Sequence, residues 1–350
     1  MIEKYLKEEV KSLKPYVPHD YDYKYKMDAN ESPFNIEPEI MQSIVSRLLA
    51  TDINRYPDTN SMKLRKSISE FIKVDYKNIV VGNGSDEMIH VLLNTFVGQD
   101  EVVVSHEPTF SMYGINTKVL GGRYMEIPTD EEFDIEIDKL IAVSNDFGAK
   151  VIILCNPNNP TGNLIPKDDI LKVLDSTDSI VVVDEAYIEF GGESVVDMLS
   201  KYDRLIVLRT FSKAFGAAGI RTGYLLSSDE IVEKIAAVKP PYNLNSVSQI
   251  IASELMKNSD VIMENIKIIK AERDWLNAEM LKLSNIKVYK TGANFIMFKV
   301  KDAKAVFDRL LEDGIMIRYF SGGVLENHLR VSVGTREENE AFLKVLKEVI

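Results

Sequence analysis

Three stretches decide the fold: KVIILCNPNNPTG (150–162), SIVVVDEAY (179–187) and RLIVLRTFSK (204–213). Each begins with a short run of β-branched and aliphatic residues and ends in polar side chains. Apolar strands that alternate with helical patterns are typical of a parallel sheet covered by helices on both faces. Because open α/β sheets bind ligands beyond the carboxyl ends of their strands, the polar ends of these stretches form the expected site.

The same alternation extends over much of the chain and predicts an α/β fold with a mostly parallel seven-stranded sheet. From about residue 61 helical and strand-like patterns follow one another, as in SMKLRKSISEFI (61–72) and NIVVG (78–82). After PPYNLN (240–245) a long helical stretch leads into strands without strict alternation, which indicates a separate α+β unit. We therefore expect a large domain over 46–245, a smaller domain over 246–350, and an N-terminal arm over 1–45 that forms part of the smaller domain.

Composition limits the classes of partner. The 350 residues include 42 Lys and Arg against 54 Asp and Glu, and this net charge of −12 argues against nucleic acid or an anionic membrane as the main partner. The single cysteine, Cys155, and four scattered histidines offer no metal-ligand spacing, so no metal is expected. Apolar runs are much shorter than the roughly 20 residues that span a bilayer. The charged N-terminus does not resemble a signal peptide, and we expect a cytoplasmic protein.

Lys213 stands in an unusual setting for a lysine. Its neighbours in RTFSKAFGAAGIR (209–221) are small or apolar, which does not suit a solvated surface. An amine in such surroundings has a lowered pKa, as a Schiff-base lysine requires. Asp184 precedes Lys213 by 29 residues, about one strand–helix–strand step. Both groups are thus expected at neighbouring strand ends, where they contact one ligand.

Two further stretches are predicted to form loops that directly follow strands. VGNGSDE (81–87) is a strand–glycine–helix junction, where free backbone amides at the helix start form an anion site. CNPNNPTG (155–162) contains two Asn-Pro pairs and a glycine and predicts a rigid turn.

Together these motifs resemble the fold-type I aminotransferases that depend on pyridoxal 5′-phosphate (PLP), and above all the histidinol-phosphate aminotransferase family. The resemblance covers nearly the whole chain. It is carried by PYVP (15–18), DANESP (28–33), RYPD (55–58), GSDE (84–87), NPNNPTG (156–162), DEAY (184–187), SKAFGAAGIR (212–221) and LRVSVGT (329–335).

For the cofactor ring, the resemblance implies specific roles. Lys213 would form the Schiff base and later carry a proton between the substrate and the cofactor. Asp184 would pair with the pyridine nitrogen and keep it protonated, so that the ring withdraws electrons. Asn156 and Tyr187 would hydrogen-bond the ring oxygen, and Phe110 would stack on the ring face. Lys213, Asp184 and Tyr187 are the expected catalytic residues.

The cofactor phosphate would lie at the start of the helix that follows Gly84. The resemblance assigns to it the backbone amides of this helix and nearby hydroxyls and cations, from Ser85, Asp86, Thr210, Ser212 and Arg221. Tyr56 matches a tyrosine that reaches this phosphate from a partner subunit. The resemblance therefore implies a homodimer with shared active sites.

For the substrate, Arg330 matches the arginine that holds the amino-acid carboxylate, and Arg318 matches a position linked to the substrate phosphate. The other expected lining residues are Tyr16, Asn30, Tyr242 and Asn243. One departure concerns His19, which stands in PYVPH where the family commonly has glycine, so the folding of the arm over the substrate is left open.

The implied reaction is ping-pong transamination between histidinol phosphate and 2-oxoglutarate in histidine biosynthesis. An aromatic-amino-acid aminotransferase or a PLP-dependent threonine-phosphate decarboxylase would share most of these motifs. A nicotinamide-dependent oxidoreductase built on VGNGSDE is a remote alternative, because Glu87 occupies the place of the third glycine and Lys213 is left unexplained. A non-catalytic binding protein would be expected to lack Lys213, Asp184 or Arg221, and all three are present.

Overall fold

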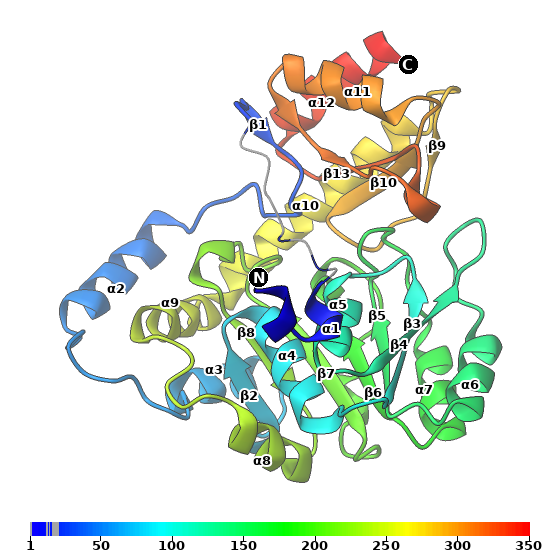
Figure 1. Ribbon diagram of the computed structural model, residues 1–350. Helices are drawn as coiled ribbons and strands as arrows, with labels where there is room; N and C mark the ends of the chain where they lie inside the picture. Colours follow the sequence, from blue (N-terminus) through cyan, green and yellow to red (C-terminus); the bar gives the residue numbers. More distant parts are fainter. Residues whose placement is uncertain (1, 12, 14, 16–20) are drawn as a thin grey trace.

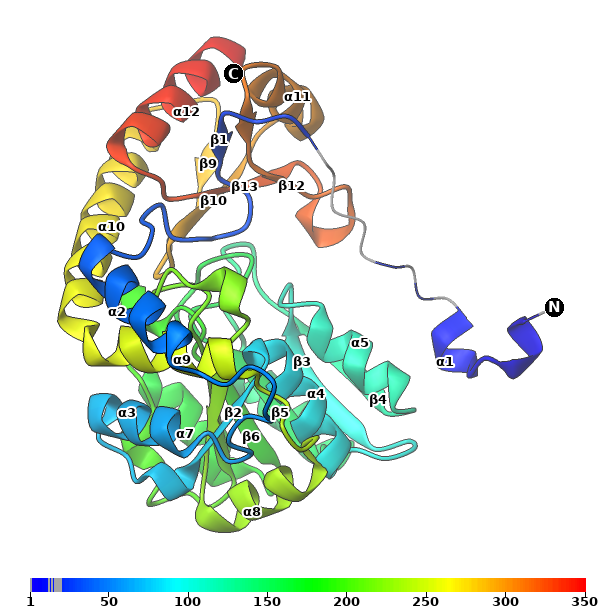
Figure 2. The ribbon, with the colours of Figure 1, turned by 90° about the vertical axis from the view of Figure 1, so that its left-hand side faces the viewer.

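The computed structural model describes residues 2–11, 13, 15 and 21–350. It consists of a large α/β body and a smaller body that lies against the large one (Figure 1). The long helix α10 (Ser259–Met280) runs from the large body along one side of the smaller one (Figure 2). The short helix α1 (Glu8–Lys11) lies beside helix α5 (Met112–Val119), and the Lys7 amine donates to the Val119 carbonyl over 3.4 Å.

In the described residues, the large body contains a seven-stranded sheet in the order β2-β8-β7-β6-β5-β3-β4. β8 is antiparallel to both of its neighbours, and the other neighbouring strands are parallel. The mostly parallel seven-stranded sheet is thus confirmed. The strands are β2 (Ile79–Gly82), β3 (Val102–Glu107), β4 (Arg123–Pro128), β5 (Val151–Cys155), β6 (Ile180–Asp184), β7 (Leu205–Thr210) and β8 (Gly223–Leu226).

Helices cover both faces of this sheet, because alternate residues of the central strands point to opposite sides. Ile152 and Leu154 of β5 face one hydrophobic cluster, whereas Val151 and Ile153 face the other. The first cluster is closed by α2 (Pro38–Leu49), α3 (Met62–Ile72), α6 (Ile137–Asp146), α7 (Lys167–Ser176) and α9 (Ser246–Lys257). The second is closed by α4 (Gly84–Phe96), α5 and α8 (Asp229–Val238).

The smaller body has its own core. An antiparallel sheet in the order β12-β13-β10-β9 packs against α10, α11 (Ala303–Glu312) and α12 (Arg336–Val349). Its strands are β9 (Lys287–Val288), β10 (Phe295–Lys299), β12 (Arg318–Tyr319) and β13 (His328–Ser332). The N-terminal strand β1 (Tyr25–Lys26) pairs in parallel with β11 (Ile315–Met316), and Met27 enters this core.

The segments near the predicted domain limits pack in a specific way. Helix α9 packs against both α2 and α3, and all three contribute to the core of the large body, while α10 connects that core to the smaller one. The division at residues 45 and 245 stays a prediction about domain boundaries. Over the described residues, none of the helices combines the length and apolar character that crossing a membrane requires.

Candidate functional site

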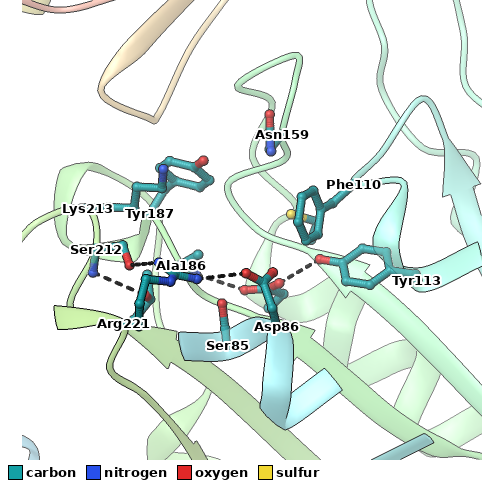
Figure 3. Close-up of a pocket in the computed structure, with 13 residues that line it drawn as sticks. Ser85, Asp86, Phe110, Tyr113, Asn159, Ala186, Tyr187, Ser212, Lys213 and Arg221 are labelled. Atoms are coloured by element: carbon teal, nitrogen blue, oxygen red, sulfur yellow. Dashed lines mark hydrogen bonds and ion pairs between the residues drawn. The ribbon is translucent and has the colours of Figure 1, made fainter. Parts of the chain in front are cut away.

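A pocket of about 130 Å³ opens where strands β5, β6 and β7 end and helix α4 begins (Figure 3). Parallel strands present their carboxyl ends at one edge, so Cys155, Asp184 and Thr210 meet there although they are far apart in the chain. The pocket is lined by Ser85, Asp86, Phe110, Tyr113, Cys155, Asn159, Asp184, Ala186, Tyr187, Thr210, Ser212, Lys213 and Arg221.

Lys213 lies in the turn after β7, and its amine is held by a backbone carbonyl. Its Nζ donates to the oxygen of Ala29 over 2.8 Å and lies 5.7 Å from the centre of the Tyr187 ring. Burial lowers the pKa of the Lys213 amine to about 8, and the charges of Arg330 and Arg221 contribute in the same direction. A sizeable fraction of this amine is therefore neutral near pH 7 to 8, as a nucleophile and proton carrier must be.

Asp184 ends β6 as a buried carboxylate with two hydrogen-bond donors. Its Oδ2 accepts from the hydroxyl of Tyr113 over 2.6 Å, and its Oδ1 accepts from the amide of Ala186 over 3.1 Å. Burial raises the pKa of Asp184 to about 6, although both donors act to lower it. Tyr113 was not among the predicted site residues, because its contact with Asp184 spans 71 residues and leaves no periodic pattern in the sequence.

Tyr187 is linked to Asn30, which comes from the N-terminal segment. The side-chain amide of Asn30 donates to the Tyr187 hydroxyl over 3.0 Å, and the backbone amide of Asn30 donates to Ser332 Oγ over 2.8 Å. Burial raises the pKa of Tyr187 to about 12, so this hydroxyl keeps its proton and serves as a donor at neutral pH. Asn30 adopts a left-handed backbone with φ of 55°, a conformation that asparagine tolerates well.

The other end of the pocket is suited to an anion. Ser85 and Asp86 lie in the first turn of α4, where backbone amides have no partner within the helix. Arg221 reaches this turn, with Nη2 3.0 Å from Asp86 Oδ2 and Nη1 3.3 Å from Ser212 Oγ. Thr210 adds a second hydroxyl to the lining, and its Oγ1 accepts from the Ser212 amide.

Phe110 and Asn156 differ in their placement. Phe110 lines the pocket, and its ring meets that of Tyr113 edge-on with the two centres 5.6 Å apart. Asn156 is fully buried beside the pocket and does not line it. Its side chain accepts from the Ile165 amide over 2.9 Å and donates to the Ile165 carbonyl over 3.2 Å, which holds the NPNNPTG turn in shape. The expected contact of Asn156 with the ring oxygen stays a prediction.

Two arginines of the smaller body face each other across strands β12 and β13. Arg318 stands directly opposite Arg330 in the antiparallel register. Arg330 is 7% exposed, donates to Asn159 at the pocket wall, and donates to the Asp28 carbonyl over 2.7 Å. Asn159, which the sequence reasoning did not single out, thus connects the pocket to Arg330.

The remaining predicted residues do not line this pocket, or lie outside the residues that the structure describes. Tyr56 is 82% exposed and stacks on Tyr242, with ring centres 4.5 Å apart, in a separate surface hollow. The Asn243 side chain donates to Glu87 Oε2 over 2.7 Å and braces the start of α4. Tyr16 and His19 lie outside the described residues.

The residues present fit PLP. Within the described residues, Asp184 is in no ion pair, so a buried carboxylate is available to a protonated ring nitrogen. Lys213 supplies an amine for the aldehyde, Phe110 an aromatic face, and the α4 start with Arg221 a phosphate site. Among the described residues, no group of three or more His, Cys, Asp or Glu side chains is placed so that it could hold a metal ion.

Comparisons with known proteins identify the family. The family description "Aminotransferase class I and II" matches residues 23–346. A histidinol-phosphate aminotransferase of Clostridium novyi is 42% identical over 347 residues, covering 99% of this chain and 98% of the relative. The crystal structure of the histidinol-phosphate aminotransferase of Sinorhizobium meliloti in complex with pyridoxal 5′-phosphate aligns with a TM-score of 0.90 at 25% identity, over 98% of this chain and 97% of the other. That of the Clostridium acetobutylicum enzyme aligns with a TM-score of 0.86 at 30% identity, over 93% and 98%. The chain therefore belongs to the class I and II aminotransferases, the PLP-dependent transaminases that its motifs resemble, and within them to the histidinol-phosphate aminotransferase family.

Proposed function

We propose that this protein transfers an amino group between histidinol phosphate and 2-oxoglutarate, with PLP as cofactor, as a step of histidine biosynthesis. The observation that carries the proposal is the pair Arg318 and Arg330, which stand opposite each other beside the pocket of Lys213. Side chains directly opposite each other lie on the same face of a sheet, so both guanidinium groups face the same side, where the substrate would bind. A phosphate group, with a charge close to −2 at neutral pH, suits the guanidinium group of Arg318, and the carboxylate of glutamate suits that of Arg330.

When bound, PLP supplies an aldehyde that takes up the amino group and a ring that withdraws the electron pair from the substrate α carbon. The amine of Lys213 removes and returns the proton at this carbon, and its pKa of about 8 suits both directions near neutral pH. Asp184 places a negative charge at the ring nitrogen, and Tyr187 donates from its protonated hydroxyl. The start of α4 and Arg221 would hold the cofactor phosphate, and Lys213 in the same pocket would then reach the aldehyde.

The direct test is an amino-transfer assay of the PLP-loaded protein with 2-oxoglutarate as acceptor. Histidinol phosphate is compared with histidinol, which lacks the phosphate, with phenylalanine and with threonine phosphate. We expect histidinol phosphate to exceed the others by at least about 100-fold in kcat/KM, the value of one or two charged hydrogen bonds. A higher kcat/KM for phenylalanine, or carbon dioxide release from threonine phosphate, would contradict the assignment.

Arg318→Gln separates the phosphate from the rest of the substrate. Removal of this guanidinium should lower kcat/KM for histidinol phosphate about 10- to 100-fold and should change phenylalanine turnover, which involves no phosphate, by less than about 5-fold. The matched control is Arg309→Gln, an exposed arginine in α11 that pairs with Asp313 over 2.6 Å. An equal loss of kcat/KM with both substrates would show that Arg318 does not act on the substrate phosphate.

We further propose that the protein is a homodimer in which Tyr56 completes the site of the partner subunit. Tyr56 does not line the pocket of its own chain. It lies on a surface that also exposes Leu49 by 85% and Ile53 by 73%, more apolar area than a solvated face normally carries in one place. A cytoplasmic location is also proposed, because the single cysteine needs no oxidising compartment.

Mixed dimers of Lys213→Ala and Tyr56→Ala test the shared site. If Tyr56 acts across the interface, the mixed dimer has one site with both defects and one native site, so mixing should restore up to about a quarter of wild-type activity from two impaired parents. This figure follows from random assortment of equal amounts of subunits. If Tyr56 acts within its own chain, each site of the mixed dimer carries one defect and mixing restores nothing. A monomeric mass in light scattering would contradict the dimer directly.

A further inference from the structure

Tyr113 is the buried neighbour of the carboxylate that faces the cofactor ring. It lies in the first turn of α5, 0% exposed, and its hydroxyl donates to Asp184 Oδ2 over 2.6 Å (Figure 3). On the other side of the carboxylate, Oδ1 accepts from the Ala186 amide. The carboxylate is thus held at both oxygens, by one side chain and one backbone group, and each oxygen keeps a further lone pair for a ligand.

The charges around this carboxylate do not stabilise it strongly. Asp86 and Glu185 repel it, and its strand neighbour Cys155 has a pKa raised to about 12 by burial, so that thiol adds no charge. The cations of the pocket, Lys213 and Arg221, bind the Ala29 carbonyl and Asp86 respectively. Tyr113 is therefore the one side chain of the described residues that hydrogen-bonds Asp184.

The strength of this contact follows from its chemistry. A hydroxyl that donates to an ionised carboxylate at 2.6 Å is a short, charge-assisted hydrogen bond, about twice as strong as a neutral one. It favours the ionised carboxyl over the neutral one. Burial raises the pKa of Tyr113 well above its ordinary value, so the phenol remains a donor throughout the working pH range.

We propose that Tyr113 is a positioning residue of the transaminase, whose hydroxyl keeps the Asp184 carboxylate ionised and oriented toward the ring nitrogen of the cofactor. This inference rests on the proposed function, since it requires a pyridine ring in the pocket. Tyr113 contacts Asp184 and acts on the cofactor ring only through it. The strength of the electron withdrawal by the ring then depends on Tyr113, which lies outside the family motifs quoted above.

Tyr113→Phe removes one oxygen and keeps the buried ring. In the cofactor-free protein, the Asp184 carboxyl is titrated by carbon-13 NMR with labelled aspartate, and Asp184→Asn assigns the signal. We expect a midpoint near pH 6 in the wild type and a midpoint about one unit higher in Tyr113→Phe, because the donor to the ionised form is lost. An unchanged midpoint overturns the proposal.

Cofactor binding gives a second readout. PLP is compared with 1-deazapyridoxal 5′-phosphate, in which carbon replaces the ring nitrogen. Tyr113→Phe should raise the Kd of PLP about tenfold and that of the deaza analogue by less than about twofold, because only PLP uses the Asp184 charge. Equal weakening of both ligands would mean that Tyr113 merely supports the pocket, and would overturn the proposal.

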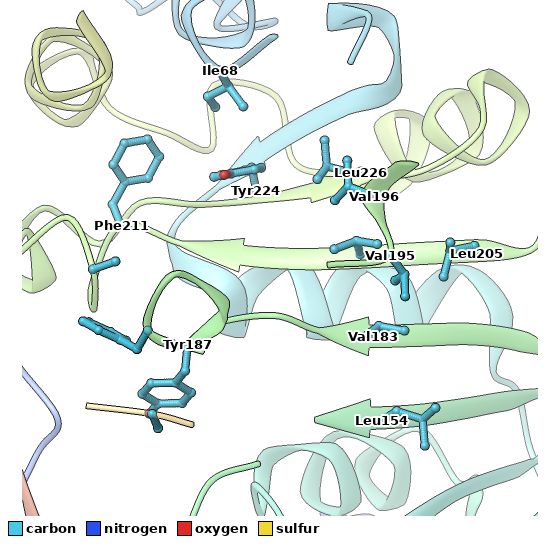
Figure 4. Packing of buried hydrophobic residues seen from close by; sticks show 14 of the residues in the cluster. Ile68, Leu154, Val183, Tyr187, Val195, Val196, Leu205, Phe211, Tyr224 and Leu226 are labelled. Atoms are coloured by element: carbon cyan, nitrogen blue, oxygen red, sulfur yellow. The ribbon is translucent and has the colours of Figure 1, made fainter. Parts of the chain in front are cut away.

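Tyr224→Phe is the matched control. Tyr224 is also fully buried, but it packs against Phe211 in the core on β8 and does not line the pocket (Figure 4). It should change neither the Asp184 midpoint nor the ratio of the two Kd values. If Tyr113→Phe does not fold, wild-type protein labelled with 3-fluorotyrosine replaces it. The more acidic hydroxyl donates more strongly and should move the Asp184 midpoint down, and an unmoved midpoint again overturns the proposal.

The two claims fail differently. If wild-type protein does not bind PLP, the proposed function fails, while the titration of the cofactor-free protein still measures the Tyr113–Asp184 contact. If wild-type protein binds PLP and Tyr113→Phe leaves both readouts unchanged, the positioning role alone is wrong.

Discussion

Burial of the Asp184 carboxylate, which the proposed function uses, makes the fold less stable at neutral pH. Burial raises its pKa to about 6 from the value of 3.8 for an exposed aspartate. Between these two values the folded protein binds more protons at this site than the unfolded chain, so this group makes the fold less stable as the pH rises from about 4 to 6. At neutral pH this pKa difference lowers the free energy of unfolding by roughly 3 kcal/mol, at 1.36 kcal/mol per pKa unit.

Asp184→Asn should therefore stabilise the cofactor-free protein. The substitution removes the buried charge but loses one acceptor for Tyr113 or Ala186, so the net gain in the free energy of unfolding is expected at about 1–2 kcal/mol at pH 7. Urea unfolding measures it, and the gain should disappear at about pH 4, where the carboxyl of the folded wild type is neutral. A variant less stable than wild type at pH 7 would show that the carboxylate does not destabilise the fold.

At the scale of elements, the site depends on how closely β8 approaches the start of α4. A Cβ on Gly223 would lie 2.4 Å from the Ser85 amide nitrogen, and one on Gly84 would lie 2.9 Å from Arg221 Nη2. Gly84 also has a left-handed φ of 78°, which favours glycine. The two glycines let the strand, the helix start and the arginine meet at the proposed phosphate site.

Gly223→Ala should separate these elements. Because the clash is with backbone atoms, the variant should lose about 1–3 kcal/mol of stability and bind inorganic phosphate and PLP more weakly by about tenfold or more. Gly219→Ala is the control, since a Cβ there meets nothing within 4 Å. Isothermal titration calorimetry measures the binding of both ligands to the two variants. An effect of Gly219→Ala as large as that of Gly223→Ala would contradict the steric explanation.

At the scale of the whole molecule, the segment Asp28–Asn30 joins the two bodies at the site. The Ala29 carbonyl accepts from Lys213 of the large body, and the Asp28 carbonyl accepts from Arg330 of the smaller one. Asn30 bonds to Tyr187 on one side and to Ser332 on the other. Three consecutive residues of the N-terminal segment thus connect the proposed cofactor site to the proposed substrate site.

Asn30→Gly tests this link because glycine keeps the left-handed backbone and removes the side chain. We expect kcat/KM to fall about 10- to 100-fold through loss of the Tyr187 contact and looser positioning of the bodies. Hydrogen exchange of residues 28–34 should become faster. Asn327→Gly is the control, since Asn327 also has a left-handed φ, of 64°, but lies in the turn before β13. Equal losses in the two variants would rule out the specific role of Asn30.

The sequence by itself determined the α/β fold, the seven-stranded sheet, the family and the PLP-dependent enzyme class. The fold and the sheet follow from local patterns: apolar strands such as VIILC (151–155), helix starts such as GSDE (84–87), and polar strand ends. The family and the enzyme class follow from the resemblance that the motifs from PYVP (15–18) to LRVSVGT (329–335) carry. Since the ends of parallel strands meet at one edge, Lys213 and Asp184 could be assigned to a single pocket before any contact was known, and the family resemblance added Ser85.

Only the tertiary structure decided which groups surround them. The Tyr113–Asp184 bond spans 71 residues and the Lys213–Ala29 bond spans 184, and neither leaves a periodic trace in the sequence. The position of Arg318 opposite Arg330 likewise depends on strand pairing. The exposure of Tyr56 on the surface of its own chain also became known only from the structure. Local chain geometry sets strands, helices and their ends, whereas side-chain partners depend on how distant elements pack, and packing is a property of the whole fold.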